Sequence, residues 1–375
     1  MECTNTNLKC RISTRELTDT VTETIGKSNS KLLFKNFFLL NYTLLVLCTV
    51  LILSSCSSTE KNKGFKTTTE AYDSYVGFLQ ELKKCDSLSI EDATAKVRAW
   101  QILRDSVYSY ISIDTINNSH TDVYAQTESV TEDIKTELFR LSDKHVHSFT
   151  ELIKFNKDCL PDYRIAHMDA YKSNVGNFFN SLDTLRIPNI PPKQLARSYV
   201  TFLNHALQNG FTDRTSLLSF FRDEDLYFRC FLSCFNEFEN LDMAEVSKLT
   251  EKCCYKIFKL SDNKNVKFDE LKCFMIMRTN RRLLQNAQVC FNHLKKGGKL
   301  SKDQASAYLW MTLQPFSTIG PLSLNLLTQK DEQIFLYLSD SMPYILSKLN
   351  EYLSIDYDHI VYLPKQILKA TIYNL

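Results

Sequence analysis

The chain is poor in the residues that break helices or build tight turns. Only 8 glycines and 8 prolines occur among its 375 residues. Phosphate-binding loops need several glycines, and β architectures with many tight turns need both residue types. Long helices need neither in their interior. The scarcity therefore disfavours those two classes and predicts an all-α fold, an irregular multi-helix bundle.

An excess of charge of one sign is also missing. The 45 basic and 43 acidic residues leave a formal net charge of +2. Proteins that bind nucleic acid usually carry a broad basic footprint, so we expect no nucleic-acid partner. Hydrophobic residues make up 44% of the chain and aromatic residues 12%. That content is sufficient for a substantial core and argues against wholesale disorder.

Motifs that mark common active sites are absent as well. The sequence contains no G-x-S-x-G, H-E-x-x-H, Walker-type loop or C-x-x-C, and these patterns carry nucleophile, zinc, phosphate and redox chemistry. We therefore predict no catalytic residues, no cofactor and no metal site. A non-enzymatic protein is the favoured interpretation.

Some polar residues nevertheless have suggestive spacings. Asp143, His147 and Glu151 are four residues apart and would share one face of a helix, where they could hold a metal or relay a proton. Ordinary i, i+4 pairing on a solvated face explains the same spacing. Asp356 and His359 form one further pair, but no second such pair completes a di-metal bundle.

Two basic clusters raise the question of an anionic ligand. Arg278, Arg281 and Arg282 form the first. The second comprises Lys295, Lys296, Lys299 and Lys302. Either could contact anionic lipid or phosphate, but solvated helix ends are the favoured interpretation.

Of the 12 cysteines, eight follow Cys56: Cys85, Cys159, Cys230, Cys234, Cys253, Cys254, Cys273 and Cys290. They show no regular framework, and most lie in aromatic-rich helical stretches, so buried free thiols are favoured. Cys230 and Cys234 would share a helix face. With Cys253 and Cys254 they could also form a disulfide or a metal cluster, and the sequence leaves their pairing open.

One long apolar run stands near the N-terminus. Leu44 to Leu53 reads LLVLCTVLIL, follows several lysines and ends at Ser54-Ser55-Cys56. A basic flank, a short apolar core and small residues at a cleavage point are typical of a secretory signal. The cysteine after the small residues resembles the lipobox of bacterial lipoproteins.

That resemblance implies a lipid anchor at one residue. The signal would be cleaved between Ser55 and Cys56, and the Cys56 thiol would carry a diacylglyceryl group, with a further acyl chain such as palmitate on the freed amine. Two or more chains are needed for stable anchoring. Ser57 in place of aspartate resembles the pattern sorted to the outer membrane. The resemblance implies a lipoprotein of the bacterial cell envelope, anchored to membrane lipid.

An uncleaved anchor is the alternative. Phe37 to Ser55 is long enough to cross a hydrocarbon core of about 30 Å as a transmembrane helix. Residues 1–31 differ from a short basic leader because they carry Glu16, Asp19 and Glu23. We expect the true start to lie downstream, near Leu32 or Leu33.

The rest of the chain divides by composition. We expect an N-terminal extension and signal over 1–55 (apolar core 37–55), a polar tether over 56–66, and helical subdomains over 67–185 and 194–375. The boundary is RIPNIPPK at 186–193, whose three prolines cannot continue a helix. Apolar periodicity and cap residues predict helices at about 67–82, 90–113, 129–156, 163–182, 194–209, 217–241, 244–260, 267–296, 301–314, 332–353 and 365–373.

A second resemblance concerns modification. Asp followed by Ser or Thr and then an aliphatic residue, Met or Thr resembles an O-glycosylation sequon of exported proteins in one Gram-negative phylum. The implied acceptors are Ser87, Ser106, Thr115, Thr184 and Ser341. Clustering of Asp and Ser at helix caps explains the pattern equally.

Together these patterns indicate a membrane-anchored helical interaction module with an envelope protein or glycan as partner. The alternative is a lipid-anchored enzyme or ligand-binding protein whose site assembles from distant helices. A pocket with converging carboxylates or histidines would favour the enzyme. An exposed apolar patch on helical faces would favour the interaction module.

Overall fold

The computed structural model describes residues 65–118, 121–234, 244–353 and 357–375. Within these residues the chain is all-α and contains no strand, as predicted. No helix of the described part has the length and apolar content to cross a bilayer, and the apolar run at 37–55 lies outside it. The helices are α3 (Thr68–Lys83), α4 (Ile90–Asn118), α5 (Thr121–Ser142), α6 (Phe149–Asp158), α7 (Asp162–Leu182), α8 (Pro192–Asn209), α9 (Arg214–Ser233), α10 (Ala244–Asp262), α11 (Phe268–Lys295), α12 (Lys302–Thr318), α13 (Pro321–Asn325), α14 (Gln329–Asp340), α15 (Met342–Asn350) and α16 (Tyr357–Asn374), with a 3₁₀ turn at Asp143–His145.

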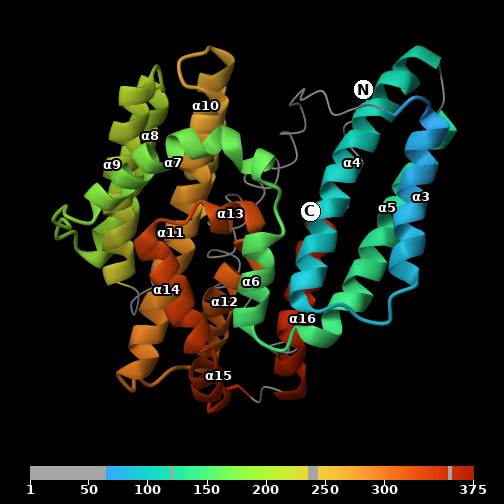
Figure 1. The fold of residues 1–375 in the computed structure, drawn as a ribbon. Helices are drawn as coiled ribbons and strands as arrows, with labels where there is room; N and C mark the ends of the chain where they lie inside the picture. The colour runs from blue at the N-terminus through green and yellow to red at the C-terminus, as the bar shows by residue number, and fades with distance from the viewer. Residues whose placement is uncertain (1–64, 119–120, 235–243, 354–356) are drawn as a thin grey trace.

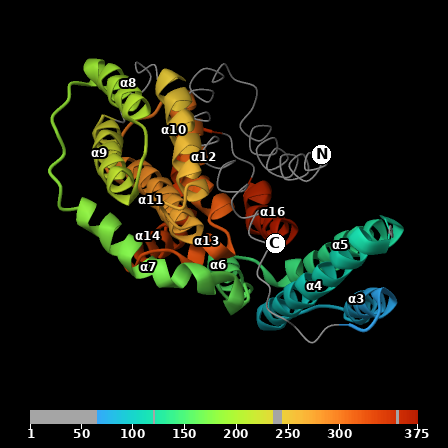
Figure 2. The same ribbon diagram turned by 90° about the horizontal axis from the view of Figure 1, so that it is seen from above.

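The helices are arranged in two groups. Helices α3, α4 and α5 pack against one another in an up-and-down unit, and α7 to α15 gather around α11 (Figure 1). Figure 2 shows the three-helix unit to one side of the group around α11. Helices α6 and α16 join the two groups, since both contact helices of each. Helix α7 packs along α11 although it precedes 186–193, and the subdomain boundary there stays a prediction.

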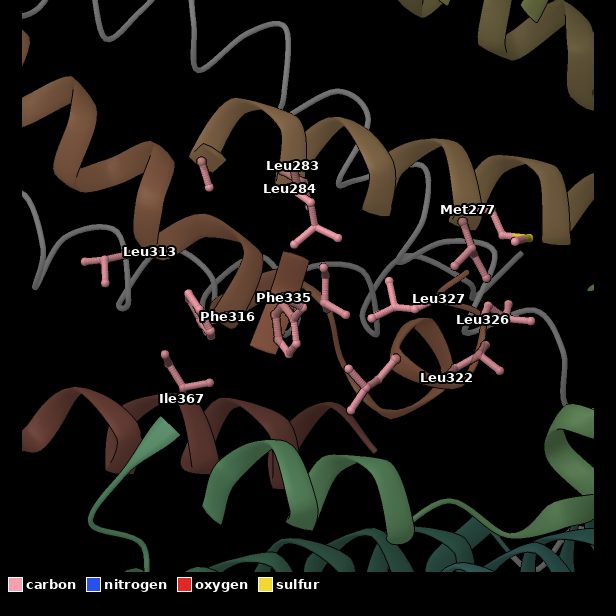
Figure 3. Packing of buried hydrophobic residues seen from close by; sticks show 14 of the residues in the cluster. Met277, Leu283, Leu284, Leu313, Phe316, Leu322, Leu326, Leu327, Phe335 and Ile367 are labelled. Atoms are coloured by element: carbon pink, nitrogen blue, oxygen red, sulfur yellow. The ribbon is translucent and has the colours of Figure 1, made fainter. Parts of the chain in front are cut away.

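Helix α11 is the centre of the larger group. Every residue from Leu271 to Leu284 is buried, on all sides of the helix. A helix that is buried on all sides lies inside a core. Figure 3 shows Met277, Leu283 and Leu284 of α11 among buried residues of α12, α13, α14 and α16.

Close approach of α7 to α11 depends on a glycine. A Cβ added at Gly176 would lie 3.3 Å from Cε of Met277 and 3.7 Å from Cγ2 of Thr328. Next to it, Phe178 and Phe179 of α7 contact the ring of Phe274, with centroids 5.9 and 6.2 Å away. Aromatic pairs at such separations add to the burial of apolar area. The interface is therefore dense and aromatic.

Several helix ends follow the predicted signals. Ser301 and Gln304 form a capping box at the start of α12, and the Thr67 side chain accepts the Glu70 amide at the start of α3. Helix α8 ends at Gly210 (φ +72°) and α11 ends just before Gly297 (φ +74°). Both glycines have a positive φ, which glycine adopts more readily than other residues.

Two stretches predicted as single helices are each divided into two helices in the structure. The stretch 129–156 is not one helix, because α5 already begins at Thr121 and ends at Ser142, and α6 starts anew at Phe149. The stretch 332–353 is split into α14 and α15 at Ser341. In both cases apolar periodicity continues across a turn.

Candidate functional site

The predicted face of Asp143, His147 and Glu151 does not form. Asp143 lies in the 3₁₀ turn and His147 lies outside any helix. Glu151 closes a capping box with Ser148, and its Oε2 accepts the His147 backbone N–H at 2.7 Å. Glu151 therefore caps α6. Among the described residues, no group of three or more His, Cys, Asp or Glu side chains could hold a metal ion.

The three arginines of α11 are buried, and their prediction as a solvated helix end is wrong. Arg278, Arg281 and Arg282 are 3%, 2% and 6% exposed. Buried charges are stable only when paired. Their partners are carboxylates of α9 and of the turn after α7.

Glu224 of α9 is the first of these partners, and four contacts occupy its two oxygens. Nη2 of Arg278 donates to Oε1 at 2.6 Å and Nε to Oε2 at 3.1 Å. Arg282 pairs with Oε2, and the Tyr199 hydroxyl of α8 donates to Oε1 at 2.6 Å. This is a bidentate, charge-assisted arrangement, the strongest kind of ion pair in proteins.

The electrostatics keep Glu224 ionised. Burial alone raises the pKa of its carboxyl, but Arg278 and Arg282 outweigh burial and lower the pKa to about 2. Both guanidinium groups also lie near aromatic rings, Arg278 at 5.7 Å from the Phe221 centroid and Arg282 at 4.4 Å from that of Phe228. Such cation–π contacts help to retain a desolvated cation.

Arg281 extends the network in two directions. It pairs with Asp183 after α7, which also accepts from Nζ of Lys330 in α14 at 2.5 Å. Its Nε lies 3.7 Å from Asp225, whose Oδ2 is 3.1 Å from Nε of Arg229. Burial raises the pKa of Asp183, but Lys330 and Arg281 outweigh it and lower the pKa. The pKa of Asp225 is raised because its burial outweighs the arginines.

This network connects helices that are distant in sequence. Tyr199 comes from α8, Glu224 from α9, Arg278 and Arg282 from α11, and Asp183 from the end of α7. Glu224 is unsuited to act as a general base, because a base needs a pKa near the working pH and access to a proton. Its pKa is about 2 and its side chain is 1% exposed. The arrangement locks the larger helix group together.

A smaller polar network holds the three-helix unit. Nε1 of Trp100 donates to the Tyr75 hydroxyl at 2.8 Å, and that hydroxyl is 3.1 Å from Oγ1 of Thr131. The Tyr108 hydroxyl donates to Oε1 of Glu128 at 2.6 Å. Satisfied buried networks of this kind specify one packing arrangement.

The eight cysteines after Cys56 are free thiols in the structure. All are buried except Cys85 and Cys234, which are half-buried. Burial raises the pKa of Cys253 and of Cys273 to about 12. The thiolate is the reactive form, so these thiols are inert in the folded chain.

The glycosylation acceptors occupy unequal positions. Ser87 and Thr184 are exposed, in the connections after α3 and α7. Ser106 is half-buried within α4 and Ser341 half-buried between α14 and α15. Thr115 falls in α4, and its side chain lies outside the described residues. A bulky glycan needs a surface position, which Ser87 and Thr184 provide.

An exposed aromatic surface lies where α14 and α15 meet the end of α11. Tyr337 and Tyr344 are 43% and 41% exposed, and both pack edge-on against the buried ring of Phe291. Their centroids are 5.3 and 6.1 Å from that of Phe291. We call these three residues the tyrosine surface. Sequence periodicity did not single them out, because exposed and buried tyrosines look alike in a helix.

Known proteins offer no further guide to this site. No protein-family model matches the chain, and no curated protein or solved structure is significantly similar to it.

Proposed function

We propose that this is a lipid-anchored protein of the bacterial cell envelope whose helical body is a non-enzymatic interaction module. The interaction module is supported by one contrast: the charged network is buried and paired, whereas two aromatic side chains are exposed. Glu224 and its arginines are buried and mutually paired, whereas Tyr337 and Tyr344 are exposed on a rigid base. Exposed apolar groups rimmed by polar residues mark interaction sites.

The anchor is supported by Leu44 to Cys56. A short apolar run followed by two serines and a cysteine resembles the lipobox, in which the cysteine corresponding to Cys56 is lipid-modified. A diacylglyceryl group would supply the two chains that stable anchoring needs. The uncleaved transmembrane anchor of residues 37–55 is the competing form of the same attachment.

Metabolic labelling with an alkyne fatty acid tests the anchor. We expect label on the wild type and on Cys48→Ala, which changes the other cysteine nearby, and none on Cys56→Ala. Mass spectrometry should show that the mature chain begins at Cys56. Unchanged labelling and processing of Cys56→Ala would overturn the lipoprotein, and an unlabelled wild type retaining residues 37–55 would establish the uncleaved anchor.

A further inference from the structure

The tyrosine surface has a basic border. Nζ of Lys295 lies 6.0 Å from the Phe291 ring centroid, and Lys295, Lys296, Lys299 and Lys302 are all exposed. No acidic residue occurs between positions 295 and 302. On the other side Lys348 is paired with Glu351 at 2.6 Å. The charge that positions 295–302 bring to the border of the tyrosine surface is therefore positive.

The loop that carries Lys296 and Lys299, between α11 and α12, is held in place. Gly297 takes a left-handed conformation, and the Gly298 backbone lies under the His293 ring, where a Cβ would come within 2.1 Å of Nε2. The Tyr352 hydroxyl donates to the Gly298 carbonyl at 3.5 Å. A fixed loop costs little entropy on binding. The border and the rings thus form one preorganised face.

We infer that this face binds an acidic polypeptide segment that carries an apolar side chain. The lysines would pair with the carboxylates, and the apolar group would lie against the rings of Tyr337 and Tyr344. Tyrosine is enriched among the residues that dominate protein–protein binding energy, and complementary charge steers association. The inference rests on the proposed interaction module and names its partner.

The position of the face favours a polypeptide over the anchoring membrane. Helix α3, at which the described chain begins, starts at the top of Figure 1, whereas α15 lies at the bottom. Only residues 56–64 separate Cys56 from the described body, a reach of about 30 Å when fully extended. Helix α15, which carries Tyr344, therefore lies at the opposite end of the described body from the start of α3 (Figure 1).

A random peptide library panned against the full-length protein in detergent tests this inference. We expect selected peptides rich in Asp and Glu around an apolar residue, with anisotropy titrations showing binding that weakens as salt rises. The double variant Tyr337→Ala/Tyr344→Ala should weaken binding at least tenfold, and Lys296→Glu/Lys299→Glu about tenfold. Circular dichroism should show that both double variants are folded. If the tyrosine variant unfolds, the lysine variant still tests the inference, because both of its substitutions are at exposed positions.

Matched controls on α10 should leave the affinity unchanged: Tyr255→Ala, whose ring is 63% exposed, and Lys248→Glu/Lys252→Glu. Phosphatidylglycerol vesicles and polygalacturonate are the competing probes. The inference is overturned if no acidic peptide is selected, if the face variants bind as tightly as the controls, or if only vesicles or polygalacturonate bind. Peptide binding in detergent does not depend on acylation of Cys56, so its failure is distinct from failure of the anchor.

Discussion

Glu224 remains ionised in surroundings where a lone carboxylate would cost several kcal/mol. Two arginines and a tyrosine hydroxyl make this tolerable by occupying both of its oxygens. The converse also holds, since each arginine depends on the carboxylate. At the scale of single residues, a substitution at Glu224 therefore disturbs Arg278 and Arg282 as well.

Glu224→Gln should destabilise the protein by about 3–5 kcal/mol, because it leaves Arg278 and Arg282 buried without a counter-charge. Urea unfolding followed by circular dichroism measures the loss. Glu332→Gln is the matched control, because Glu332 pairs with Lys157 at the surface, and such pairs contribute about 1 kcal/mol or less. Equal losses in the two variants would show that the network carries no stability.

Acid should weaken the wild type more than Glu224→Gln. The folded pKa of Glu224 is about 2, below its ordinary value of 4.5, so its stabilisation is complete above that value and is lost as pH falls towards 2. The linked free energy is about 3 kcal/mol. The pKa of Asp225 is raised, so protonation of Asp225 at low pH favours the folded state. This contribution is present in both proteins and largely cancels when their free energies of unfolding are compared. If the free energy of unfolding fell equally in both proteins between pH 5 and pH 2, this account would be contradicted.

The sequence placed three arginines on one helix but could not show where that helix lies. Arg278 meets a carboxylate 54 positions away, and no local spacing encodes such a pairing. A usable signal was nevertheless present. The segment CFMIMRTNRRLL has five apolar residues before the first arginine and two after the last, a pattern that favours a buried helix over a solvated end.

At the scale of helices, cap residues and glycines predicted the helix ends correctly, whereas apolar periodicity did not predict where one helix stops and the next begins. Ser301 with Gln304, Gly210 and Gly297 marked real boundaries because each supplies a hydrogen bond or a backbone conformation that the helix end requires. The break between α5 and α6 was missed because Ser148 and Glu151, its capping box, were interpreted as part of a continuing helix. Periodicity alone cannot distinguish a turn between helices from one more helical turn.

Gly176→Val should destabilise the protein by about 1–3 kcal/mol, because the added methyl groups must displace Met277 and Thr328 between α7 and α11. Thermal unfolding measures the effect. Gly77→Val on α3 is the control, since nothing lies within 4 Å of its added Cβ. A loss in the control as large as that in Gly176→Val would rule out close packing as the cause.

At the scale of the whole molecule, the two helix groups are tied by polar as well as apolar contacts. Arg164 of α7 pairs with Asp105 of α4 at 2.5 Å, and the Tyr163 hydroxyl donates to the same carboxylate at 2.5 Å. The amide of Gln101 donates to the Cys159 carbonyl at 2.8 Å. These contacts cross the division between the groups, so we expect them to unfold together.

The two tryptophans allow that expectation to be checked. Trp310→Phe leaves Trp100, which is buried in the three-helix unit, as the sole fluorescent reporter of that unit. Its urea transition should coincide with that of the far-ultraviolet circular dichroism, which reports all helices. Separate midpoints would mean that α3 to α5 unfold independently.

The buried thiols have a consequence for the life of the chain before it folds. Each thiol that packing now shields is open to oxidation in the unfolded chain, and eight free cysteines can pair in many incorrect ways. In an oxidising compartment, folding would shield these thiols, and incorrect disulfides could form only in the interval before the chain folds. Rapid folding would then limit thiol oxidation by shortening this interval. A variant that folds slowly would be trapped with incorrect disulfides even where its free energy of unfolding is unchanged.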